Sequence, residues 1–366
     1  MSYITSIGTA NPPHKFTQSQ IADFMIRAMN LSTEEADRLK LLYRASGIES
    51  RYSVLSDYGS DHFNFYPNSD NFEPFPTTRD RVELFRKESV GISQLAATRC
   101  ATRIPALDPN DITHLIVVSC TGMFAPGLDI ELQQKLNLKS TVQRTCINFM
   151  GCYAAFNALR LADSFCAQHE DHKVLLVCTE LCSIHFQKEN TDDNKLANAL
   201  FADGAAAIIV EPKMRKGMNL EIGSFFCDLV PDGENDMAWT IGDQGFEMKL
   251  SAYVPDLIKK GIGKLTSALL AANHINLHDI SYFAIHPGGK KILEAIESEL
   301  KLTKNDNRHA YHVLKNHGNM SSPTVIYVLN EIWKDLNNID EGKKILSFGF
   351  GPGLTLESLI LTIKNF

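Results

Sequence analysis

The sequence predicts an α/β protein in which helices cover both faces of a sheet. Apolar runs short enough for strands alternate along the chain with longer amphipathic runs, the order expected when helices connect the strands of a sheet. The strand-like runs are apolar throughout, which is typical of strands buried on both faces. With 366 residues, 44% of them hydrophobic, the chain is long enough for two domains or one large layered fold.

The first half of the chain opens with a strand that ends in a turn at residues 10–13. A mostly helical stretch follows at residues 17–46, and residues 57–80 form an irregular loop whose aromatic side chains look exposed. Those aromatic residues are Phe63, Phe65, Tyr66, Phe72 and Phe75. The elements expected next are a helix at 77–103, a strand at 114–120, a helix ending at 136, a strand before residue 152, a helix at 153–167, and strands at 173–178 and 205–210.

A charged, turn-rich segment at residues 211–217 marks the predicted domain boundary. We therefore expect an N-terminal half, 1–217, and a C-terminal half, 218–366. The second half is predicted to contain a strand at 220–227, a helix at 253–272, a strand at 281–286, helices at 290–300 and 323–336, and strands at 344–350 and 355–363. The two halves share a rough order of elements without a fixed-period repeat, which excludes a repeat array but leaves a diverged duplication open.

Composition excludes several classes of protein. The formal net charge of −7 argues against a general nucleic-acid binder, because no basic surplus is available to neutralise phosphates. The first eight residues do not have the pattern of a signal peptide, and no apolar run approaches the length of a membrane span. We expect a soluble cytoplasmic protein.

The eight cysteines suggest buried thiols and not a disulfide framework. Cys120, Cys146 and Cys178 lie in or beside strand-like runs, and Cys166 lies in a helical run. Cys178, Cys182 and His185 do not have the spacing of a standard zinc site, and a strand would place alternate side chains on opposite faces. We expect no bound metal.

One cysteine, Cys152, stands at the turn between a predicted strand and a long apolar helix. The first N–H groups of a helix lack internal partners and carry partial positive charge, and both effects favour a thiolate. Cys152 is therefore the candidate nucleophile, and it needs a base or cation nearby.

Histidine and asparagine candidates follow other predicted elements. His286 ends a strand and precedes a Pro-Gly-Gly turn, a position that suits either catalysis or capping of the next helix. Asn319 and Ser321 precede another helix and could cap it, whereas Asn319 could also donate a hydrogen bond to a developing oxyanion. Phe201 is by default a core aromatic residue. The glycine-rich turn at 349–353 lacks the lysine and following helix of a phosphate-binding loop and predicts a tight hairpin.

Together these stretches resemble the type III polyketide synthases, the chalcone synthase-like family, here of a bacterial type. The motifs, in the family's order, are Ile7-Gly8-Thr9-Ala10-Asn11-Pro12, Gly151-Cys152 with Ala154, Ala199 to Ala206, Ile285-His286-Pro287-Gly288-Gly289, Gly318-Asn319-Met320-Ser321-Ser322 and Gly349 to Thr355. They span nearly the whole chain. The resemblance implies a thiolase-like fold of two duplicated halves in five layers, αβαβα, and a homodimer.

The resemblance also implies roles for individual residues. Cys152 would accept the acyl group, and His286 would pair with its thiolate and lower the pKa of the thiol. His286 and Asn319 would bind the thioester oxygen of malonyl-CoA while CO2 leaves. Phe201 would stand between the CoA tunnel and the cavity. Ser321 would line the cavity, and no cofactor is expected beyond the CoA thioesters that serve as substrates.

Several positions depart from the plant chalcone synthases. Trp239 falls where those enzymes have a small glycine, and Met248 falls where a gating phenylalanine is usual. His185 and Cys182 fall where threonines line the pocket. We therefore expect the cavity to differ strongly from that of a flavonoid-forming enzyme, with Trp239 shortening or redirecting it.

The basic contacts to CoA are kept only in part. Arg38 aligns with one of them, whereas Leu41 and Ala45 fall where others are expected. The residues that could substitute are Arg44, Arg51, Lys290 and Lys291. For Arg38, Arg44 and Arg51 a solvated helix face is the simpler interpretation. The starter could alternatively arrive on an acyl carrier protein.

The sequence thus predicts an acyltransferase of secondary metabolism. It would load an acyl starter on Cys152, extend it iteratively with malonyl-CoA, and release a pyrone or a phenolic product. A β-ketoacyl-ACP synthase III-like enzyme that makes a single condensation is the main alternative, because it uses the same three residue types. A non-catalytic partner subunit with a merely buried cysteine is the alternative from another class.

Overall fold

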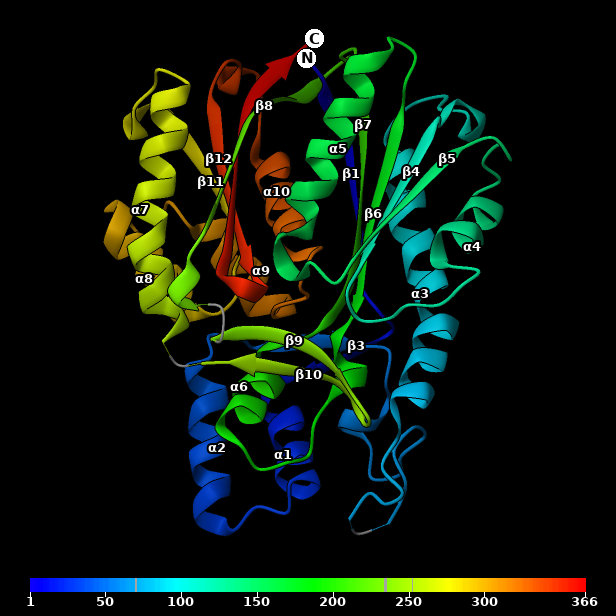
Figure 1. The fold of residues 1–366 in the computed structure, drawn as a ribbon, viewed down its shortest axis with the longest axis vertical. Helices are drawn as coiled ribbons and strands as arrows, with labels where there is room; N and C mark the ends of the chain where they lie inside the picture. The colour runs from blue at the N-terminus through cyan, green and yellow to red at the C-terminus, as the bar shows by residue number, and fades with distance from the viewer. Residues whose placement is uncertain (70, 234–235, 252) are drawn as a thin grey trace.

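A single hydrogen-bonded sheet of nine strands runs through the centre of the protein (Figure 1). The computed structural model describes residues 1–69, 71–233, 236–251 and 253–366. The strand order is β11-β12-β13-β8-β1-β7-β6-β4-β5. The strands are β1 (Tyr3–Ala10), β4 (His114–Ser119), β5 (Gln143–Asn148), β6 (Val174–Leu181), β7 (Asp203–Glu211), β8 (Met218–Leu229), β11 (Ile280–Ile285), β12 (Lys344–Gly351) and β13 (Thr355–Asn365).

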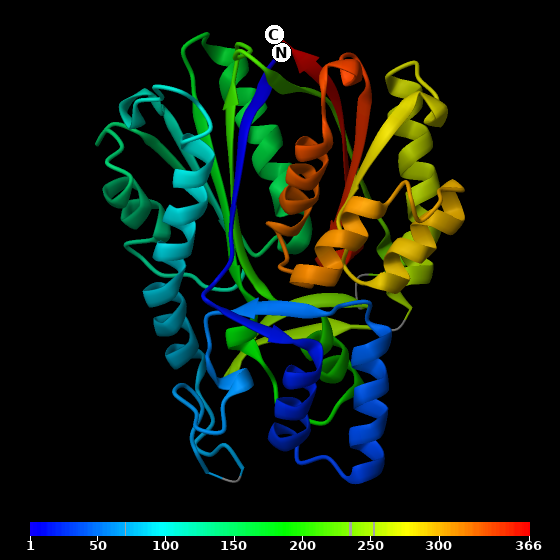
Figure 2. The same ribbon diagram turned by 180° about the vertical axis from the view of Figure 1, so that it is seen from behind.

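Helices form three layers around the two wings of this sheet. The N-terminal wing, strands β1, β7, β6, β4 and β5, is covered on its outer face by α3 (Thr78–Ala101) and α4 (Leu128–Lys135). The C-terminal wing, strands β8, β13, β12 and β11, has α7 (Val254–Ala272) and α8 (Lys290–Leu300) outside it. Between the wings lie α5 (Ala154–Gln168) and α10 (Thr324–Asp335), with α9 (Arg308–His317) beside α10 (Figure 2). This is the five-layer arrangement of a thiolase-like fold.

The central strands are buried as the sequence predicts, whereas β5 and the second half of β8 are not. Every residue of β4, β6 and β7 is buried. Strand β5 is one of the two edge strands of the sheet, pairs in parallel with β4 alone, and exposes Gln143, Arg144 and Cys146. The expectations that all strands are apolar throughout and that Cys146 is buried are therefore wrong, because an edge strand needs polar residues to limit association with other chains. Cys120, Cys166 and Cys178 are buried as expected.

The two wings meet through a short contact between β1 and β8. β1 pairs antiparallel with β7 along most of its length. Its pairing with β8 comprises Tyr3–Glu221 and Ile4–Leu220. The wings therefore form one continuous sheet with a narrow waist, and α5 and α10 fill the space on one side of it.

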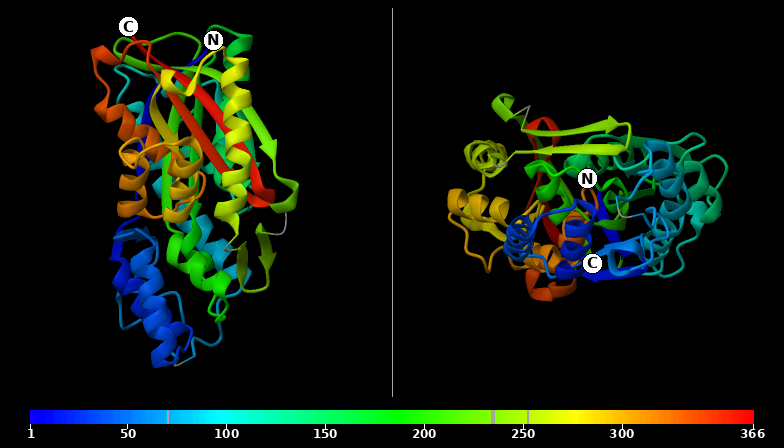
Figure 3. Two further views of the ribbon diagram at one scale, coloured as in Figure 1. Left: turned by 90° about the vertical axis from the view of Figure 1, so that its left-hand side faces the viewer. Right: turned by 90° about the horizontal axis from the view of Figure 1, so that it is seen from below.

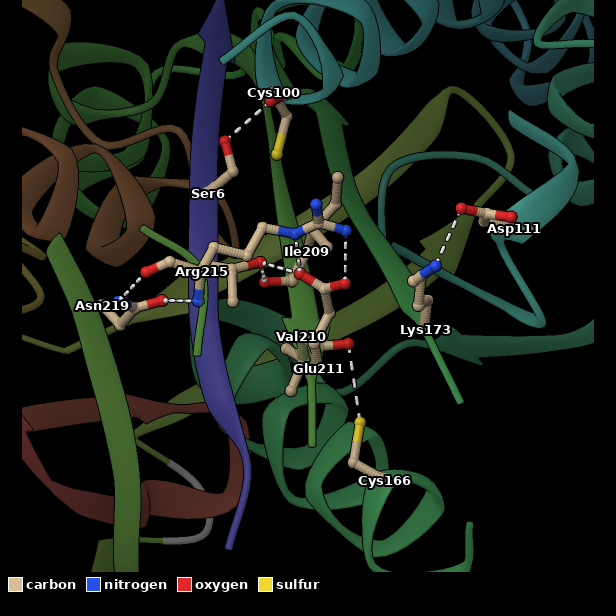
Figure 4. A network of polar contacts seen from close by, with 11 residues as sticks. Ser6, Cys100, Asp111, Cys166, Lys173, Ile209, Val210, Glu211, Arg215 and Asn219 are labelled. Atoms are coloured by element: carbon tan, nitrogen blue, oxygen red, sulfur yellow. Dashed lines mark hydrogen bonds and ion pairs between the residues drawn. The ribbon is translucent and has the colours of Figure 1, made fainter. Parts of the chain in front are cut away.

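The segment that leads from β7 to β8, residues 212–217, is held by side chains (Figure 4). The buried Glu211 carboxylate accepts hydrogen bonds from Arg215 Nε at 2.5 Å, Arg215 Nη2 at 2.6 Å and Thr5 Oγ1 at 2.6 Å. Asn219 donates to the Arg215 carbonyl and accepts from the Arg215 N–H. These bonds satisfy both the carboxylate and the turn backbone, so they fix the crossing between the wings.

A smaller lobe lies at the end of the sheet away from the chain termini (Figure 3, left). It contains α1 (Gln18–Ala28), α2 (Thr33–Ala45), α6 (Asp192–Leu200), the β2–β3 pair (His14–Thr17 and Ser50–Ser53) and the β9–β10 hairpin (Met237–Gly242 and Gly245–Leu250). The predicted helical stretch at 17–46 is two helices, because Asn30 adopts φ 49° and Ser32 forms a capping box with Glu35. The sequence did not predict α6 or the hairpin.

The aromatic loop before α3 is packed inward, contrary to the prediction. Four of its rings are buried, namely Phe63, Tyr66, Phe72 and Phe75. They surround Phe24 of α1, either directly or through one another. The Asp57 carboxylate accepts from the N–H groups of Asn64 and Phe65, which fixes the backbone without a regular element. The prediction was wrong because polar residues separate these aromatic residues in the sequence, and such a pattern is typical of an exposed loop.

Two negative findings concern the described residues. None of their helices combines the length and apolarity needed to cross a bilayer. They also contain no group of three or more His, Cys, Asp and Glu side chains arranged to hold a metal ion.

Candidate active site

Cys152 lies in the turn between β5 and α5, as the sequence predicts. The chain reverses there through two residues in the left-handed region, Phe149 (φ 60°) and Gly151 (φ 76°). A 3-10 turn over Gly151–Tyr153 leads into α5, so Cys152 precedes the helix by one short turn. A Cβ on Gly151 would lie 2.4 Å from the ring of Pro352, so both the conformation and the space require glycine.

The surroundings of Cys152 oppose ionisation. The residue is 7% exposed, and burial raises the pKa of its thiol to about 12. His286 is fully buried, and burial lowers the pKa of its imidazole to about 3. The sequence predicted a thiol pKa lowered by the helix N-terminus and by His286, and the structure gives the opposite direction. Burial therefore favours the neutral form of each group.

Asn319 and His286 reach the same place from the C-terminal half. Cys152 Sγ lies 4.0 Å from Asn319 Oδ1, which also accepts from the N–H of Ser321 at 2.9 Å. Both ring nitrogens of His286 are buried and lack a hydrogen-bond partner among the described residues. The capping alternatives do not hold, because the N-caps of α8 and α10 are other residues. Imidazole and amide are thus placed to meet a ligand.

One narrow hollow, the reaction chamber, brings these groups together. Cys152, His286 and Asn319 all line it. The predicted cavity residues that also line it are Ser321, Phe201, Met248, Trp239 and Cys182. Its remaining walls are largely apolar.

A second narrow hollow, the inner hollow, adjoins the reaction chamber. Four side chains line both spaces and form the partition between them: Cys182, Phe201, Trp239 and Met248. His185 lines the inner hollow and not the reaction chamber. Phe201 is therefore half-buried in a wall between two spaces, and the default interpretation as a core aromatic is wrong.

Two consecutive backbone carbonyls hold two of the rings at these hollows. Trp239 Nε1 donates to the Cys120 carbonyl at 2.7 Å, and His185 Nε2 donates to the Thr121 carbonyl at 2.7 Å. The Phe246 N–H donates to His185 Nδ1 at 3.0 Å, so His185 is a neutral imidazole with both nitrogens used. Burial lowers the pKa of His185 to about 3, in agreement with this pattern.

An outer groove of about 1080 Å³ leads toward the reaction chamber, with which it shares Leu250, Gly288 and Ile292. Lys290 and Lys291, two of the predicted CoA contacts, line it. The wall on α2 contains Leu42 and Ala45, and α6 contributes Lys195, which the sequence did not single out.

The three arginine candidates lie elsewhere. Arg38 is exposed and paired with Glu34, and Arg44 is exposed and donates to a carbonyl of its own helix. Arg51 is 4% exposed, and its Nη1 donates to the Phe201 carbonyl at 2.5 Å. Arg51 lines the inner hollow and not the outer groove, so its assignment to CoA stays a prediction. Packing against α1 and α2 encloses it.

A buried carboxylate beside the reaction chamber was not predicted. Glu180 of β6 is fully buried and accepts from the Cys120 N–H at 2.9 Å, Thr121 Oγ1 at 2.8 Å and Ser322 Oγ at 2.6 Å. Burial raises the pKa of Glu180. It ties the end of β4 to the loop before α10. The sequence does contain a signal for Glu180, because it is the single acidic residue in the otherwise largely apolar strand β6.

Comparisons with known proteins match this architecture over its whole length. The model of chalcone and stilbene synthases, N-terminal domain, matches residues 1–213, and the model of the C-terminal domain matches residues 221–364. Probable polyketide synthase 1 of Dictyostelium discoideum is 31% identical over 368 residues, which is 98% of this chain but 11% of that protein. The alpha-pyrone synthesis polyketide synthase-like Pks18 of Mycobacterium tuberculosis is 29% identical over 370 residues, 99% of this chain and 91% of that protein.

Solved structures share the fold closely. PKS-I from the brown alga Ectocarpus siliculosus superposes with a TM-score of 0.92 at 29% identity, covering 99% of this chain and 98% of that one. The C-terminal type III polyketide synthase domain of Steely1 from Dictyostelium gives 0.90 at 30% identity, covering 99% of both chains. The chain therefore belongs to the chalcone and stilbene synthase family of type III polyketide synthases, which are enzymes of the acyltransferase class.

Proposed function

We propose that this protein loads an acyl starter onto Cys152 and extends it by decarboxylative Claisen condensation with malonyl-CoA. The observation that carries the proposal is the meeting of Cys152, His286 and Asn319 in one buried chamber. A thiol, an imidazole and an amide are the groups that acyl transfer and stabilisation of an enolate require. Both imidazole nitrogens lack partners among the described residues, so they are available to substrate.

Loading begins with a proton transfer inside the neutral pair. The His286 imidazole takes the Cys152 proton as the sulfur attacks the thioester carbonyl. The thiolate of CoA leaves, and the imidazolium returns the proton to it. Because burial disfavours each isolated charge, thiolate and imidazolium form together and only during the reaction.

Extension uses His286 and Asn319 as hydrogen-bond donors. Both donate to the thioester oxygen of the malonyl group while its C–C bond breaks and CO2 leaves. The enolate carbon attacks the acyl group on Cys152, a C–C bond forms, and the Cys152 thiolate is released. Phe201, in the partition, orients the malonyl unit. The largely apolar chamber limits water and so protects the acyl-cysteine from hydrolysis.

The product is a cyclised pyrone or phenol. The printed name of the mycobacterial relative, which refers to alpha-pyrone synthesis, supports a pyrone. Lys290 and Lys291 in the outer groove support entry of CoA thioesters. An acyl carrier protein is an alternative donor of the starter.

The organisation of the protein completes the proposal. Residues 1–217 and 218–366 are its two halves, supported by the family models that end at 213 and begin at 221. The working form is a homodimer in the cytoplasm.

The test is product analysis by mass spectrometry with malonyl-CoA and a panel of acyl-CoA starters. We expect several extensions followed by cyclisation. A single two-carbon extension would favour the synthase III-like alternative, and no acylation of Cys152 would favour a non-catalytic subunit.

Two variants separate the steps. Cys152→Ala should abolish acylation and product. Asn319→Ala should still form the acyl-enzyme, seen as an intact-mass adduct, but lose decarboxylation. Loss of the adduct in Asn319→Ala would contradict the division of roles.

A further inference from the structure

Arg51, in the wall of the inner hollow, is a buried cation whose hydrogen bonds within the described part of the chain go to neutral oxygens. It lies in β3 and is 4% exposed. Its Nε donates to Gln18 Oε1 at 2.9 Å, and its Nη1 donates to the Phe201 carbonyl at 2.5 Å. Because burying a charge costs free energy unless the charge is paired, filling space does not by itself explain an arginine here.

We infer that Arg51 is a positioning residue, which holds the Asn319 amide and Phe201 in place for decarboxylation of the malonyl group. The inference rests on the proposed function and deepens it. It is carried by the backbone bonds between the Phe201 and Asn319 segments, by the contact of Arg51 with Gly318, and by a second set of bonds through Gln18.

The backbone of Asn319 is bonded to both neighbours of Phe201. The Asn319 N–H donates to the Leu200 carbonyl at 2.9 Å, and the Ala202 N–H donates to the Asn319 carbonyl at 2.8 Å. Phe201 and Asn319 therefore form an isolated parallel β-bridge. The Phe201 carbonyl takes no part in this bridge and accepts from Arg51. A shift of Phe201 would therefore move Asn319 with it.

The stem of the Arg51 side chain also contacts the residue before Asn319. Gly318 adopts φ 70°, and a Cβ built on it would lie 2.8 Å from Cδ and 2.9 Å from Cγ of Arg51. The missing side chain of Gly318 thus allows the stem to lie against the backbone. Arg51 meets the Asn319 segment in two ways, directly at Gly318 and through Phe201.

The neighbours of Arg51 hold the chain that leads into Asn319. Their contacts are the Glu49 N–H to the Lys315 carbonyl at 2.8 Å, Ser50 Oγ to the Asn316 carbonyl at 3.2 Å, and the Tyr52 ring stacked on the His317 ring with centroids 5.5 Å apart. Residues 315–318 therefore lie along residues 49–52. Arg51 is the residue that connects this pair of segments to Phe201.

Gln18 fixes the guanidinium from the other side. Its Oε1 accepts from Arg51, and its Nε2 donates to the Ala199 carbonyl at 2.7 Å and to Ser46 Oγ at 3.1 Å. Gln18 is itself buried, in the first turn of α1. Gln18 and Arg51 together hold the carbonyls of Ala199 and Phe201, which limits motion at the end of α6.

The two steps of the reaction depend on Arg51 differently. In the proposed function, acylation uses Cys152 and His286, whereas decarboxylation also needs donation from the Asn319 amide to the thioester oxygen. Displacing a catalytic group by about 1 Å can lower a rate about a hundredfold. The hydrogen bonds of Arg51 described above lead to the Asn319 segment and not to Cys152 or His286. We therefore expect loss of Arg51 to slow decarboxylation more than acylation.

The experiment measures both steps in Arg51→Met, which keeps an unbranched stem and loses the donors. Acylation of Cys152 is followed by intact mass with the shortest acyl-CoA that the wild type accepts. Decarboxylation is followed as CO2 release from malonyl-CoA alone, in which the C–C bond breaks and the enolate takes a proton from water to give acetyl-CoA. We expect kcat for decarboxylation to fall about tenfold or more, with the acylation rate and KM for malonyl-CoA unchanged within about threefold.

Further variants test how the effect arises. Arg51→Lys keeps the charge and one bond to either acceptor, so it should recover part of the decarboxylation rate. In Asn319→Ala, which lacks the amide, adding Arg51→Met should slow the residual decarboxylation by at most about threefold. Gln18→Leu leaves Arg51 in place and removes the acceptor of its Nε. It should give the same separation of the two rates at a smaller size, also if Arg51→Met does not fold.

Arg81→Met is the matched control. Arg81 is likewise buried, and it donates to the backbone carbonyls of Pro76, Ile184 and Phe186. These carbonyls lie outside the segment that is bridged to Asn319. Arg81→Met should lower thermal stability and change the two rates by the same factor.

Three outcomes would overturn the inference. Equal losses of acylation and decarboxylation in Arg51→Met and Gln18→Leu would leave Arg51 with a structural role alone. A full further loss in the Asn319→Ala background would show that Arg51 acts independently of Asn319. A raised KM for malonyl-CoA with unchanged kcat would favour a contact between Arg51 and CoA. Absence of both steps in the wild type, with every acyl-CoA, would instead contradict the proposed function.

Discussion

The Cys152 thiol and the His286 imidazole share a chamber in which neither gains by becoming charged alone. Their pKa values, about 12 and about 3, lie on either side of neutrality, with burial as the main cause of both shifts. The reactivity of Cys152 then depends on the bound substrate and not on a thiolate that is already present before substrate binds. This differs from enzymes whose catalytic cysteine is ionised at rest.

The alkylation rate of Cys152 should report this resting state. We expect inactivation by iodoacetamide to accelerate about tenfold per pH unit between pH 6 and 9, because the thiolate fraction grows by that factor below the thiol pKa. Peptide mass spectrometry would follow the Cys152 adduct, and the exposed thiol of Cys227 would serve as the accessibility reference. A rate that is already level at pH 6 would indicate a preformed thiolate–imidazolium pair.

Trp239 gives a second prediction at this scale. Trp239→Gly should open the partition and change the product profile from one starter, because the ring and its bond to the Cys120 carbonyl are both lost. Trp239→Phe keeps most of the ring and should shift the profile less. An unchanged profile in Trp239→Gly, measured by liquid chromatography and mass spectrometry, would show that this side chain does not shape the cavity.

The residue types and motifs were enough to place Cys152, His286 and Asn319 at one site. They were not enough to place Arg51, because its enclosure depends on how α1 and α2 pack around it. The protonation states of Cys152 and His286 could not be predicted from the sequence either. It follows from desolvation, and desolvation is a property of the assembled chamber.

At the scale of elements, the turn between β5 and α5 tolerates substitution least. Gly151→Ala should sharply reduce both activity and thermal stability, since a Cβ meets the Pro352 ring and the backbone has φ 76°. Gly217→Ala is the matched control, with φ 97° and no atom within 4 Å of the added Cβ. It should cost about 1 kcal/mol of folding free energy through backbone strain, with activity unchanged.

Equal losses in the two variants would assign the effect to backbone conformation alone. Denaturant unfolding and initial rates, measured on both proteins, decide between these outcomes.

Elements with strong local signals were predicted well. The long helix α3 begins after a capping box at Thr77 and Asp80, as its sequence indicates. The break between α1 and α2 depends on a single left-handed residue, Asn30. Helix α6 is short and mostly polar, with Ala199 and Leu200 as its buried residues. The hairpin β9–β10 is partly exposed and was missed because its alternation is weak.

At the scale of the whole molecule, the crossing between the wings depends on the Glu211–Arg215 pair. Arg215→Met should destabilise the protein by about 2 kcal/mol, because the buried Glu211 carboxylate would keep only Thr5 as a side-chain donor. Combining it with Glu211→Gln should recover part of this loss. Denaturant unfolding of the two single variants and the double variant tests the coupling, and simple addition of the single losses would contradict it.

The fold class could be predicted because alternating apolar strands and helices leave few alternatives. The joining of the wings could not be predicted, because β1 and β8 are far apart in the sequence and their strand pairing comprises only Tyr3–Glu221 and Ile4–Leu220. For the same reason the sequence suggested a changed cavity but not three spaces in series. Those spaces form where segments from both halves pack together.

The two ends of the chain lie side by side, at the end of the molecule opposite the lobe of α1 and α2 (Figures 1 and 2). Gly217 and Phe366 exchange two backbone hydrogen bonds, and Ser2 accepts one from Ile222. A polypeptide fused at either end would therefore emerge away from the outer groove, and a short linker could close the chain for circular permutation. Adjacent termini allow a domain to be joined to other domains without distorting its fold. This agrees with a relative in which the matching segment occupies only 11% of a much longer protein.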